Sequence, residues 1–276
     1  MCRGPAHQKR RYARIIVFRR RGRRLPSDWQ LVAEAHLVDW PFLAADDREW
    51  LEAAVAHLLT TRRWEGSRDF ELTDEMCAVI AAQIALVCLG FDVGLDAVDA
   101  LQTIIVHPRT ITLEGTHHEG GGLLTDEPRE LSGEAHDGRG PLLLSWSAVR
   151  RETKSRRGRR NVVIHEVAHK LDMIDGVIDG TPPIDDPDLL ARWTSVATTT
   201  YRALRYRGDD LIDDYGATNP SEFFAVVSEL FFSRPAEMEA AHPELYACCR
   251  DFYRQDPAAR RARMSPIAQQ AQQSQQ

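Results

Sequence analysis

The stretch Asn161-Val-Val-Ile-His165-Glu166-Val-Ala-His169 decides how this chain is organised. Its two histidines are four residues apart, and four residues turn an α-helix by about 400°, so both imidazoles project from one helix face. Asn161 is a suitable N-cap, which fixes the start of that helix. Glu166 lies between the two rings in angle and points toward a metal-activated water rather than onto the metal. The spacing therefore predicts two nitrogen ligands, His165 and His169, for one Zn²⁺.

A His-Glu-x-x-His pattern can arise by chance in a chain with ten histidines, and its surroundings decide between chance and function. The residues around it are apolar over most of the helix circumference, namely Val162, Val163, Ile164, Val167, Ala168, Leu171 and Ile174. Such a helix should be buried. Burying two histidines and a glutamate without a metal or other partners would be costly. We therefore predict a catalytic zinc site with Glu166 as general base.

Two histidines leave a catalytic zinc one protein ligand short. Spacing leaves four carboxylates open as the third ligand: Asp172, Asp175, Glu222 and Glu229. Asp175 comes six residues after the second histidine, whereas Glu222 and Glu229 are seven residues apart on one face of a later helix. Asn219-Pro-Ser-Glu222 also fits a plain helix start, with Asn219 as N-cap and the glutamate as a capping residue. Spacing favours Glu222 but does not exclude the others.

Charge is distributed unevenly along the 276 residues. Residues 1–24 hold ten of the 35 Lys and Arg and none of the 41 Asp and Glu, so the rest of the chain is strongly acidic. An acidic body is not typical of a nucleic-acid-binding protein, and we predict no nucleic-acid partner. We predict a basic, disordered leader over 1–25, a single domain over 26–257, and a Gln-rich mobile tail over 258–276.

Cysteine usage and hydropathy point to the cytoplasm. The five cysteines are odd in number and show no disulfide framework, and Cys77 and Cys88 fall on one face of a helix as core residues. The most apolar stretch, Cys77–Phe91, contains Gln83 and is shorter than the roughly 20 residues that a membrane span needs. We predict a buried core helix there and no membrane span. The leader lacks the apolar region of a signal peptide.

Periodicity and turn residues outline the other elements. Helices are predicted over 46–64, 73–90, 189–204, 221–232 and 242–256. Short β-branched runs at 103–106 and 110–113 predict a bent strand or a hairpin, and 114–140 reads as a long loop or weak hairpin. Residues 142–144 predict a strand that either pairs with an extended substrate or is simply buried. Helices, short strands and further helices in that order indicate an α+β domain.

Three stretches together resemble the bacterial MtfA family of zinc-dependent peptidases. They are Gly140-Pro-Leu-Leu-Leu-Ser-Trp146, Asn161-Val-Val-Ile-His-Glu-Val-Ala-His-Lys-Leu-Asp-Met173 and Asn219-Pro-Ser-Glu-Phe-Phe-Ala-Val-Val-Ser-Glu-Leu-Phe-Phe-Ser233. The resemblance covers roughly residues 12–257. It implies a zincin-like peptidase domain with N-terminal helices, a small sheet and an active-site helix. It also implies that Glu222 is the third metal ligand.

The resembled family is similar in its core to the catalytic domain of anthrax lethal factor, where a tyrosine precedes the ligand glutamate by seven residues. Here Tyr215 precedes Glu222 by seven. This resemblance implies that Tyr215 donates a hydrogen bond to the oxyanion of the reaction. A packed surface tyrosine beside Asp213 and Asp214 is the other interpretation.

The resemblance implies a zinc peptidase acting on a peptide or protein substrate, with aminopeptidase-like activity as one expectation. Members of this family are also linked to binding of the transcriptional repressor Mlc, so a regulatory binding module with secondary hydrolysis is the alternative. His117, His118 and His136 lie in a Gly-rich stretch, where adjacent histidines are usually solvated. We expect no second metal there.

Overall fold

The computed structural model of the chain describes residues 22–113, 117–119, 123–125, 129–131, 133–135, 140–155, 158 and 160–263. For residues 111–113, 117–119, 123–125, 129–131 and 134 the description covers the backbone alone. The predictions for the leader up to residue 21, for the tail from residue 264 and for the side chains of His117, His118 and His136 lie outside the described parts.

Four short strands form the main sheet, in the order β1 (Arg63–Gly66), β2 (Thr103–His107), β8 (Leu142–Ser145) and β7 (Gly133–Ala135). The first three run parallel, and β7 runs antiparallel to β8 at the edge. Alternate side chains of the two central strands are buried: Ile104, Val106, Leu142 and Leu144. Since strand side chains alternate between faces, one face of the sheet packs on the core.

The region between β2 and β8 contains more strands than its composition suggests. β3 (Ile111–Leu113) pairs with β6 (Arg129–Leu131), and β4 (His117–Glu119) pairs with β5 (Leu123–Thr125). Of the two alternatives predicted for 103–106 and 110–113, a bent strand or a hairpin, the hairpin is wrong, because β2 pairs with β1 and β8 instead of with β3.

The strand at residues 142–144 is a plain buried strand. β8 lies between β2 and β7 and is hydrogen-bonded to both. It therefore has no free edge to offer an extended substrate, and that interpretation is wrong. The strand β7 occupies that edge, and its three residues have no apolar pattern from which a strand could be predicted.

The N-terminal part of the chain folds into α1 (Trp29–His36), α2 (Ala45–Thr61) and α3 (Asp74–Cys88), with short 3-10 turns η1 (Trp40–Phe42) and η2 (Gly94–Val98). The hydroxyl of Thr73 caps α3 by accepting the N–H of Met76 at 3.1 Å. Every residue of α3 from Cys77 to its end is buried, which confirms the predicted core helix. Within the described residues, no helix is long and apolar enough to span a membrane.

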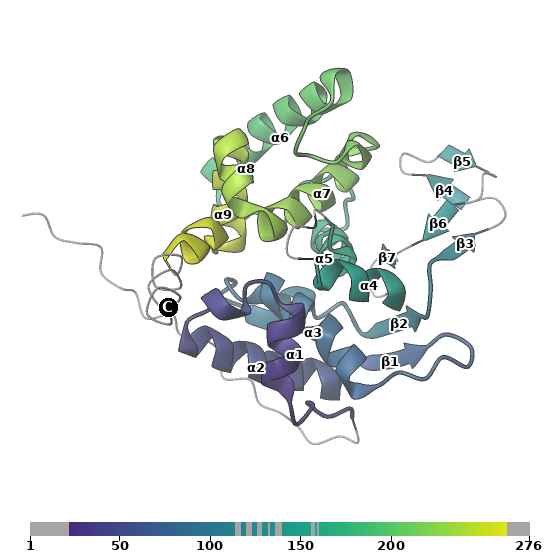
Figure 1. Cartoon of the computed structure of the whole chain (residues 1–276). Helices are drawn as coiled ribbons and strands as arrows, with labels where there is room; N and C mark the ends of the chain where they lie inside the picture. Colours follow the sequence, from purple (N-terminus) through teal and green to yellow (C-terminus); the bar gives the residue numbers. More distant parts are fainter. Residues whose placement is uncertain are drawn as a thin grey trace, which may run out of the picture.

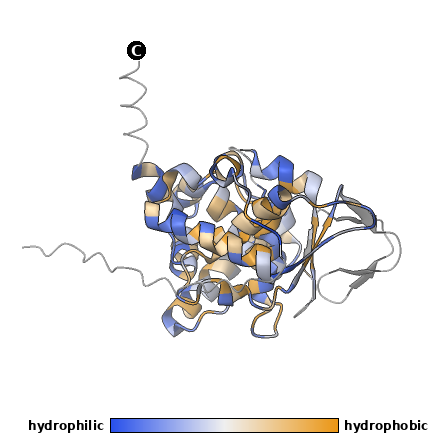
Figure 2. Cartoon of the chain, turned by 90° about the horizontal axis from the view of Figure 1, so that it is seen from below, coloured by the Kyte–Doolittle hydropathy of each residue, from blue (hydrophilic) through white to orange (hydrophobic). Residues whose placement is uncertain are grey.

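The C-terminal part consists of helices around α5 (Val162–Asp172). They are α4 (Trp146–Thr153), α6 (Pro187–Arg207), the 3-10 turn η3 (Asp214–Ala217), α7 (Pro220–Ser233), α8 (Pro235–Ala241) and α9 (Pro243–Tyr253). Figure 1 shows α5 between a lobe of α1–α3 with the sheet and a lobe of α6–α9. Apolar residues gather in the interior of the described chain, where they form one core (Figure 2). The α+β architecture is as predicted.

The end of the domain differs from the prediction of a mobile tail from residue 258. Residues 257–263 are helical. Arg260 and Arg261 contact the buried carboxylate of Asp39, at 3.4 and 2.7 Å. This ion pair joins residues more than two hundred positions apart, and local composition does not reveal it.

Among the residues that the structure describes, four free cysteines belong to the core: Cys77, Cys88, Cys248 and Cys249. Burial raises the pKa of both Cys77 and Cys88 to about 12. A thiol with so high a pKa is a poor nucleophile and a poor metal ligand. These residues act as small apolar side chains, as predicted for the first pair.

Candidate metal centre

Helix α5 presents His165 and His169 from one face. The side-chain oxygen of Asn161 accepts the N–H of Ile164 at 3.3 Å, which caps the first turn as the sequence indicates. The apolar side chains Val163, Ile164 and Val167 hold the helix in the core. The two imidazoles then lie one turn apart, with ring centroids 4.8 Å from each other.

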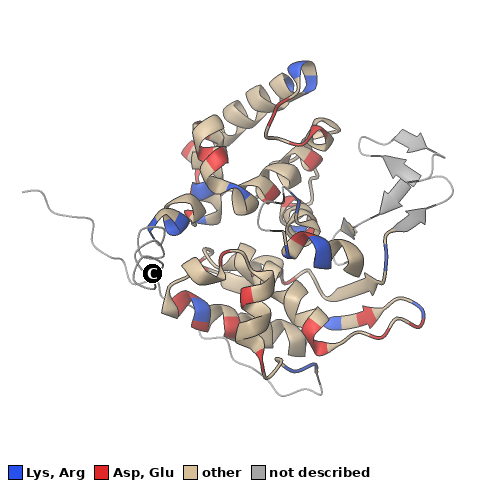
Figure 3. Cartoon of the chain, in the orientation of Figure 1, with Lys and Arg blue, Asp and Glu red and all other residues tan. Residues whose placement is uncertain are grey.

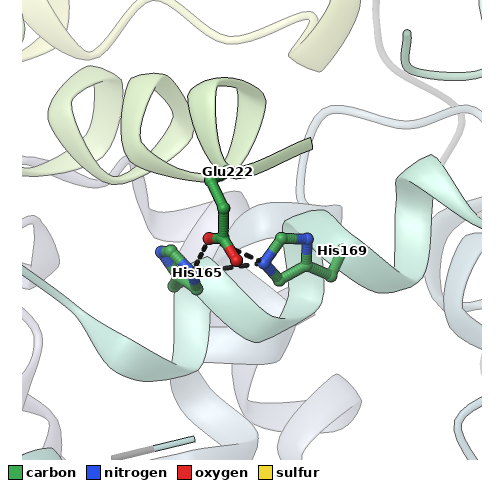
Figure 4. Close-up of side chains that lie close together, drawn as sticks. All are labelled: His165, His169 and Glu222. Atoms are coloured by element: carbon green, nitrogen blue, oxygen red, sulfur yellow. Dashed lines mark hydrogen bonds and ion pairs between the residues drawn. The ribbon is translucent and has the colours of Figure 1, made fainter. Parts of the chain in front are cut away.

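Glu222 reaches the same point from α7. Asn219 caps this helix by accepting the N–H of Glu222 at 2.9 Å, and Pro220 occupies the first helical position. Both features start the helix where the sequence predicts. Helices α5 and α7 pack directly on each other, and Figure 4 shows the carboxylate of Glu222 pointing down between the two rings.

Three potential ligand atoms converge in this arrangement. Oε2 of Glu222 lies 3.0 Å from Nε2 of His165 and 3.3 Å from Nε2 of His169. The two Nε2 atoms are 3.2 Å apart. Ligand atoms of a regular tetrahedral zinc are about 3.3 Å apart, given bonds of about 2.0–2.1 Å. Each of the three side chains is 12% exposed. The donor set fits a metal ion that is open to solvent on one side.

The far nitrogen of each imidazole is held by a second group. Nδ1 of His165 lies 2.7 Å from Oε1 of Glu229. Nδ1 of His169 lies 3.0 Å from the hydroxyl oxygen of Ser221, and that hydroxyl donates to Asp172 at 2.6 Å. Such contacts favour the tautomer with hydrogen on Nδ1, which leaves the Nε2 lone pair free for a metal. Sequence reasoning missed Ser221 altogether.

The other carboxylates that spacing left open have different partners. Besides its contact with His165, Glu229 accepts the backbone N–H of Asn161. Asp172 accepts the N–H of Gly180 at 2.9 Å as well as the serine hydroxyl. Asp175 accepts the N–H of Val177 in the loop after α5. The group that could hold a metal, among the residues the structure describes, contains Glu222 alone of the four.

Electrostatics around the two rings favour a cation. Burial by itself would raise the pKa of Glu222, but the close contacts of its carboxylate with the imidazoles of His165 and His169 outweigh burial and hold that pKa far below its usual range. Burial by itself would lower the pKa of His165, but the carboxylates of Glu229 and Glu222 raise that pKa well above 6.5. Positive charge is thus stabilised at the point where the ligand atoms meet.

Glu166 is almost fully buried beside the triad, with 4% of its surface exposed. Burial raises the pKa of its carboxyl group, and the positive charge of the two histidines opposes that rise. The edge strand β7 lies against it. A Cβ atom built on Gly133 would lie 2.5 Å from Oε1 of Glu166 and 2.7 Å from a methyl group of Val162. Glycine at this position therefore leaves the room that the carboxylate occupies.

If Glu166 is the general base that the sequence predicts, Gly133→Ala should slow hydrolysis by about 10²-fold, because displacing a catalytic group by about 1 Å costs that much. Zinc content should not change, since the atoms nearest to the added Cβ belong to Glu166 and Val162 and not to the three candidate ligands. Steady-state kinetics of the zinc-loaded protein measure the effect. Ala135→Ser adds one atom to the same strand and serves as the matched control. An equal loss in both variants would contradict the role assigned to Gly133.

Tyr215 lies in η3, on the solvent side of the triad. Its hydroxyl donates to Oε1 of Glu222 at 3.2 Å, and its ring centroid is 6.0 Å from that of His165. The side chain is 38% exposed. The structure thus brings together all five residues singled out in the sequence: Glu166, Tyr215, His165, His169 and Glu222. A hydrogen bond to the third carboxylate is a property that the seven-residue spacing does not reveal.

Comparison with known proteins gives one consistent result. The family model of the glucose-regulated metallo-peptidase M90 matches residues 7–254. An uncharacterized protein of Synechocystis sp. is 34% identical over 239 residues, which cover 85% of this chain and 86% of that protein. Mlc titration factor A of Pectobacterium atrosepticum is 34% identical over 225 residues, covering 79% and 83%. That of Edwardsiella ictaluri is 33% identical over 230 residues, covering 80% and 86%. With its fold and its convergent histidines and glutamates, this chain belongs to the M90 family of metallopeptidases, the MtfA family.

Proposed function

We propose that this protein is a zinc-dependent peptidase whose metal is bound by His165, His169 and Glu222. The observation that carries the proposal is the spacing of the three ligand atoms, 3.0, 3.2 and 3.3 Å from one another. Two imidazole nitrogens and one carboxylate oxygen are the ligand set of a catalytic zinc site in a peptidase. Thiolate ligands would favour a structural site, and an all-oxygen set would favour magnesium or calcium.

A zinc ion held by His165, His169 and Glu222 would supply a Lewis acid that polarises a peptide carbonyl and lowers the pKa of water toward about 7. In this proposal Glu166 is the general base. It is buried next to His165 in the sequence, its pKa is influenced by both histidines, and it is not part of the triad. It would accept a proton from the attacking water and return it to the leaving amine. The contact of β7 with this side chain shields it from bulk solvent.

Glu229 and the pair Ser221–Asp172 support the two histidines in this proposal. Their contacts hold each ring at Nδ1 and fix its orientation. Outer groups of this kind typically change metal affinity by about 10–100-fold when removed. This supporting role explains why the carboxylates of Glu229 and Asp172 lie near the motif without binding the metal.

Tyr215→Phe should lower kcat by about 10²-fold, the loss expected on removing one donor to a developing oxyanion. The affinity for zinc should stay within a few-fold of the wild type, since the phenol is not a ligand. Kinetics of zinc-loaded protein and a metal titration separate the two quantities. Weaker zinc binding with an unchanged kcat would instead make Tyr215 a support for Glu222, to which it is hydrogen-bonded.

The experiment that tests the peptidase is a scan of aminoacyl and internally quenched peptide substrates, with and without a chelator. Purified protein should contain one zinc per chain, hydrolyse at least one substrate class, and lose that activity with the metal. Preference for aminoacyl substrates would identify the expected aminopeptidase-like activity. A metal-replete protein inactive on every substrate would refute the proposal.

A second candidate function is a binding module that sequesters a transcriptional repressor. It is supported by the name Mlc titration factor A that several relatives carry. The two candidates predict different results for the variant that lacks Glu166. A repressor-binding module should bind its partner equally well with Glu166→Gln, whereas a peptidase should lose turnover. The full set of possible metal ligands favours the peptidase.

A further inference from the structure

A cavity of about 490 Å³ lies beside the candidate metal centre, between α6, the loop after α5 and the first turn of α7. This volume is typical of pockets that bind a ligand, which range over about 300–1,000 Å³. Pro220 and Phe223 of α7 face the cavity, while Glu222 between them points to the two histidines. The cavity and the metal centre thus occupy two faces of one helical turn.

The inner part of the cavity is aromatic. Trp193 and Phe223 are buried beneath it, and Tyr201 contacts Phe223 edge-on with ring centroids 5.7 Å apart. The indole N–H of Trp193 donates to the carbonyl of Gly180 at 3.3 Å, which fixes the ring. Aromatic rings held in this way provide a preorganised apolar surface for a side chain of similar size.

The loop that closes the cavity is also rigidly connected to the metal centre. Gly180 has a φ of +77°, and a Cβ at this position would lie 2.1 Å from the carbonyl oxygen of Pro220. Its N–H donates to Asp172, the residue that supports His169 through Ser221. A side chain bound in the cavity would therefore lie against the framework that orients one ring of the triad.

The outer part of the cavity is basic. Arg202 and Arg205 line it from the C-terminal half of α6, and Asp179 lines it from the loop. In the parts of the chain that the structure describes, neither arginine forms an ion pair with a carboxylate. The guanidinium of Arg205 lies over the ring of Tyr201, with its carbon 5.8 Å from the ring centroid. Figure 3 shows this basic end of α6 on a largely acidic chain.

The inner part of this cavity is apolar, and its opening carries two arginines without an ion-pair partner among the described residues. Such a cavity is complementary to a large apolar side chain with a carboxylate close by. We infer that this cavity is an accessory binding pocket for a polypeptide segment that carries an aromatic residue followed by acidic residues. The inference deepens the proposed peptidase function and rests on it for the role of the segment as part of a substrate. The segment binds with its ring in the cavity beside Tyr201, above the buried ring of Phe223, and with its carboxylates at Arg202 and Arg205.

The test measures binding without cleavage. Full-length Glu166→Gln protein loaded with zinc is titrated into a fluorescein-labelled peptide, Gly-Gly-Phe-Glu-Glu-Gly, and fluorescence anisotropy is recorded. Two control peptides replace Phe by Ala or both Glu by Lys. We expect the first peptide to bind at least about tenfold more tightly than either control. Equal binding of all three would overturn the inference.

Variants of α6 then locate the binding site. Arg202→Ala combined with Arg205→Ala should weaken binding of the acidic peptide by about tenfold or more. Arg202→Ala and Arg205→Ala are also measured singly, and Arg207→Ala is their matched control, because it removes one charge from the same helix end outside the cavity. It should change affinity less than about twofold. Thr198→Trp fills the cavity from an exposed position and should abolish binding. A loss as large in Arg207→Ala would indicate diffuse attraction to a basic helix end and refute the pocket.

Two further outcomes separate this inference from the proposed function. Tight binding of phenylacetate, equal to that of the peptide, would assign the pocket to a small aromatic acid and refute the polypeptide ligand. Zinc content of each variant is measured in parallel and should be unchanged. Peptide binding that depends on the pocket in a protein without hydrolytic activity would refute the peptidase and leave the pocket standing. Hydrolysis by a protein whose peptide binding does not depend on the pocket would support the peptidase and refute the pocket.

Discussion

Glu166→Gln should retain one zinc per chain and hydrolyse peptides about 10²–10⁴-fold more slowly than the wild type, the range that one general base contributes. The substitution is isosteric, so the buried position beside Gly133 keeps its packing. An amide cannot accept the proton of the attacking water. The three side chains assigned to the metal are untouched. The rate should fall in kcat, because the loss concerns the reaction and not the binding of substrate.

Metal analysis and steady-state kinetics on the same preparations test this expectation. Thermal unfolding serves as the control, and the midpoint should shift little because no buried group loses a hydrogen-bond partner in the described structure. Undiminished turnover would remove Glu166 from the mechanism. Loss of zinc together with activity would show that this carboxylate belongs to the metal site itself.

The second large effect is a difference in zinc affinity between variants of two glutamates on α7, Glu222 and Glu229. Glu222→Gln should weaken zinc binding by well over about 10²-fold, beyond the 10–100-fold typical of an outer support, because it removes the anionic ligand. Glu229→Gln should weaken it by only about 10–100-fold, since that residue holds His165 at Nδ1. Both changes replace a carboxylate by an amide on the same face of α7, seven residues apart. They are therefore matched in chemistry and in local structure.

Competition with a chromogenic chelator measures both affinities. The order of the two losses is the decisive result. If Glu229→Gln lost the metal and Glu222→Gln kept it, the ligand assignment would be reversed. If both kept it at wild-type affinity, the third ligand would have to be another residue. Asp175 is then the next candidate, although its side chain caps a loop N–H in the structure.

Much of the site could be predicted from local sequence alone. The phase of His165, Glu166 and His169 follows from helical periodicity, and the apolar residues around them require burial. The caps at Asn161 and Asn219 are also local, since each side chain bonds a backbone N–H three residues away. The long core helix α3 follows in the same way from an uninterrupted apolar run. Interactions within one turn are encoded in the order of neighbouring residues.

The third carboxylate could not be chosen from spacing, and the resemblance to a family favoured Glu222 where spacing left four residues open. In the folded chain, Asp172 bonds Ser221 and Gly180, Glu229 bonds His165 at Nδ1, and Glu222 faces both Nε2 atoms. These partners depend on how α5 and α7 pack, and the two helices are about fifty residues apart in sequence. The local sequence around a carboxylate on either helix does not depend on the partner that the carboxylate meets in the folded chain. Local sequence therefore does not identify the third ligand.

The strands and the accessory pocket depend on tertiary structure even more strongly. β7 has three residues and no apolar periodicity, yet it covers Glu166 and occupies the free edge of β8. The pocket forms because α6 has only Trp193 and Leu204 buried and leaves an aromatic and basic face beside α7. The sequence by itself determined the helix that carries the two histidines, its N-cap and its residue chemistry. Tertiary packing decided which distant groups meet that helix, because contacts between remote segments arise from the shape of the whole fold and not from neighbouring residues.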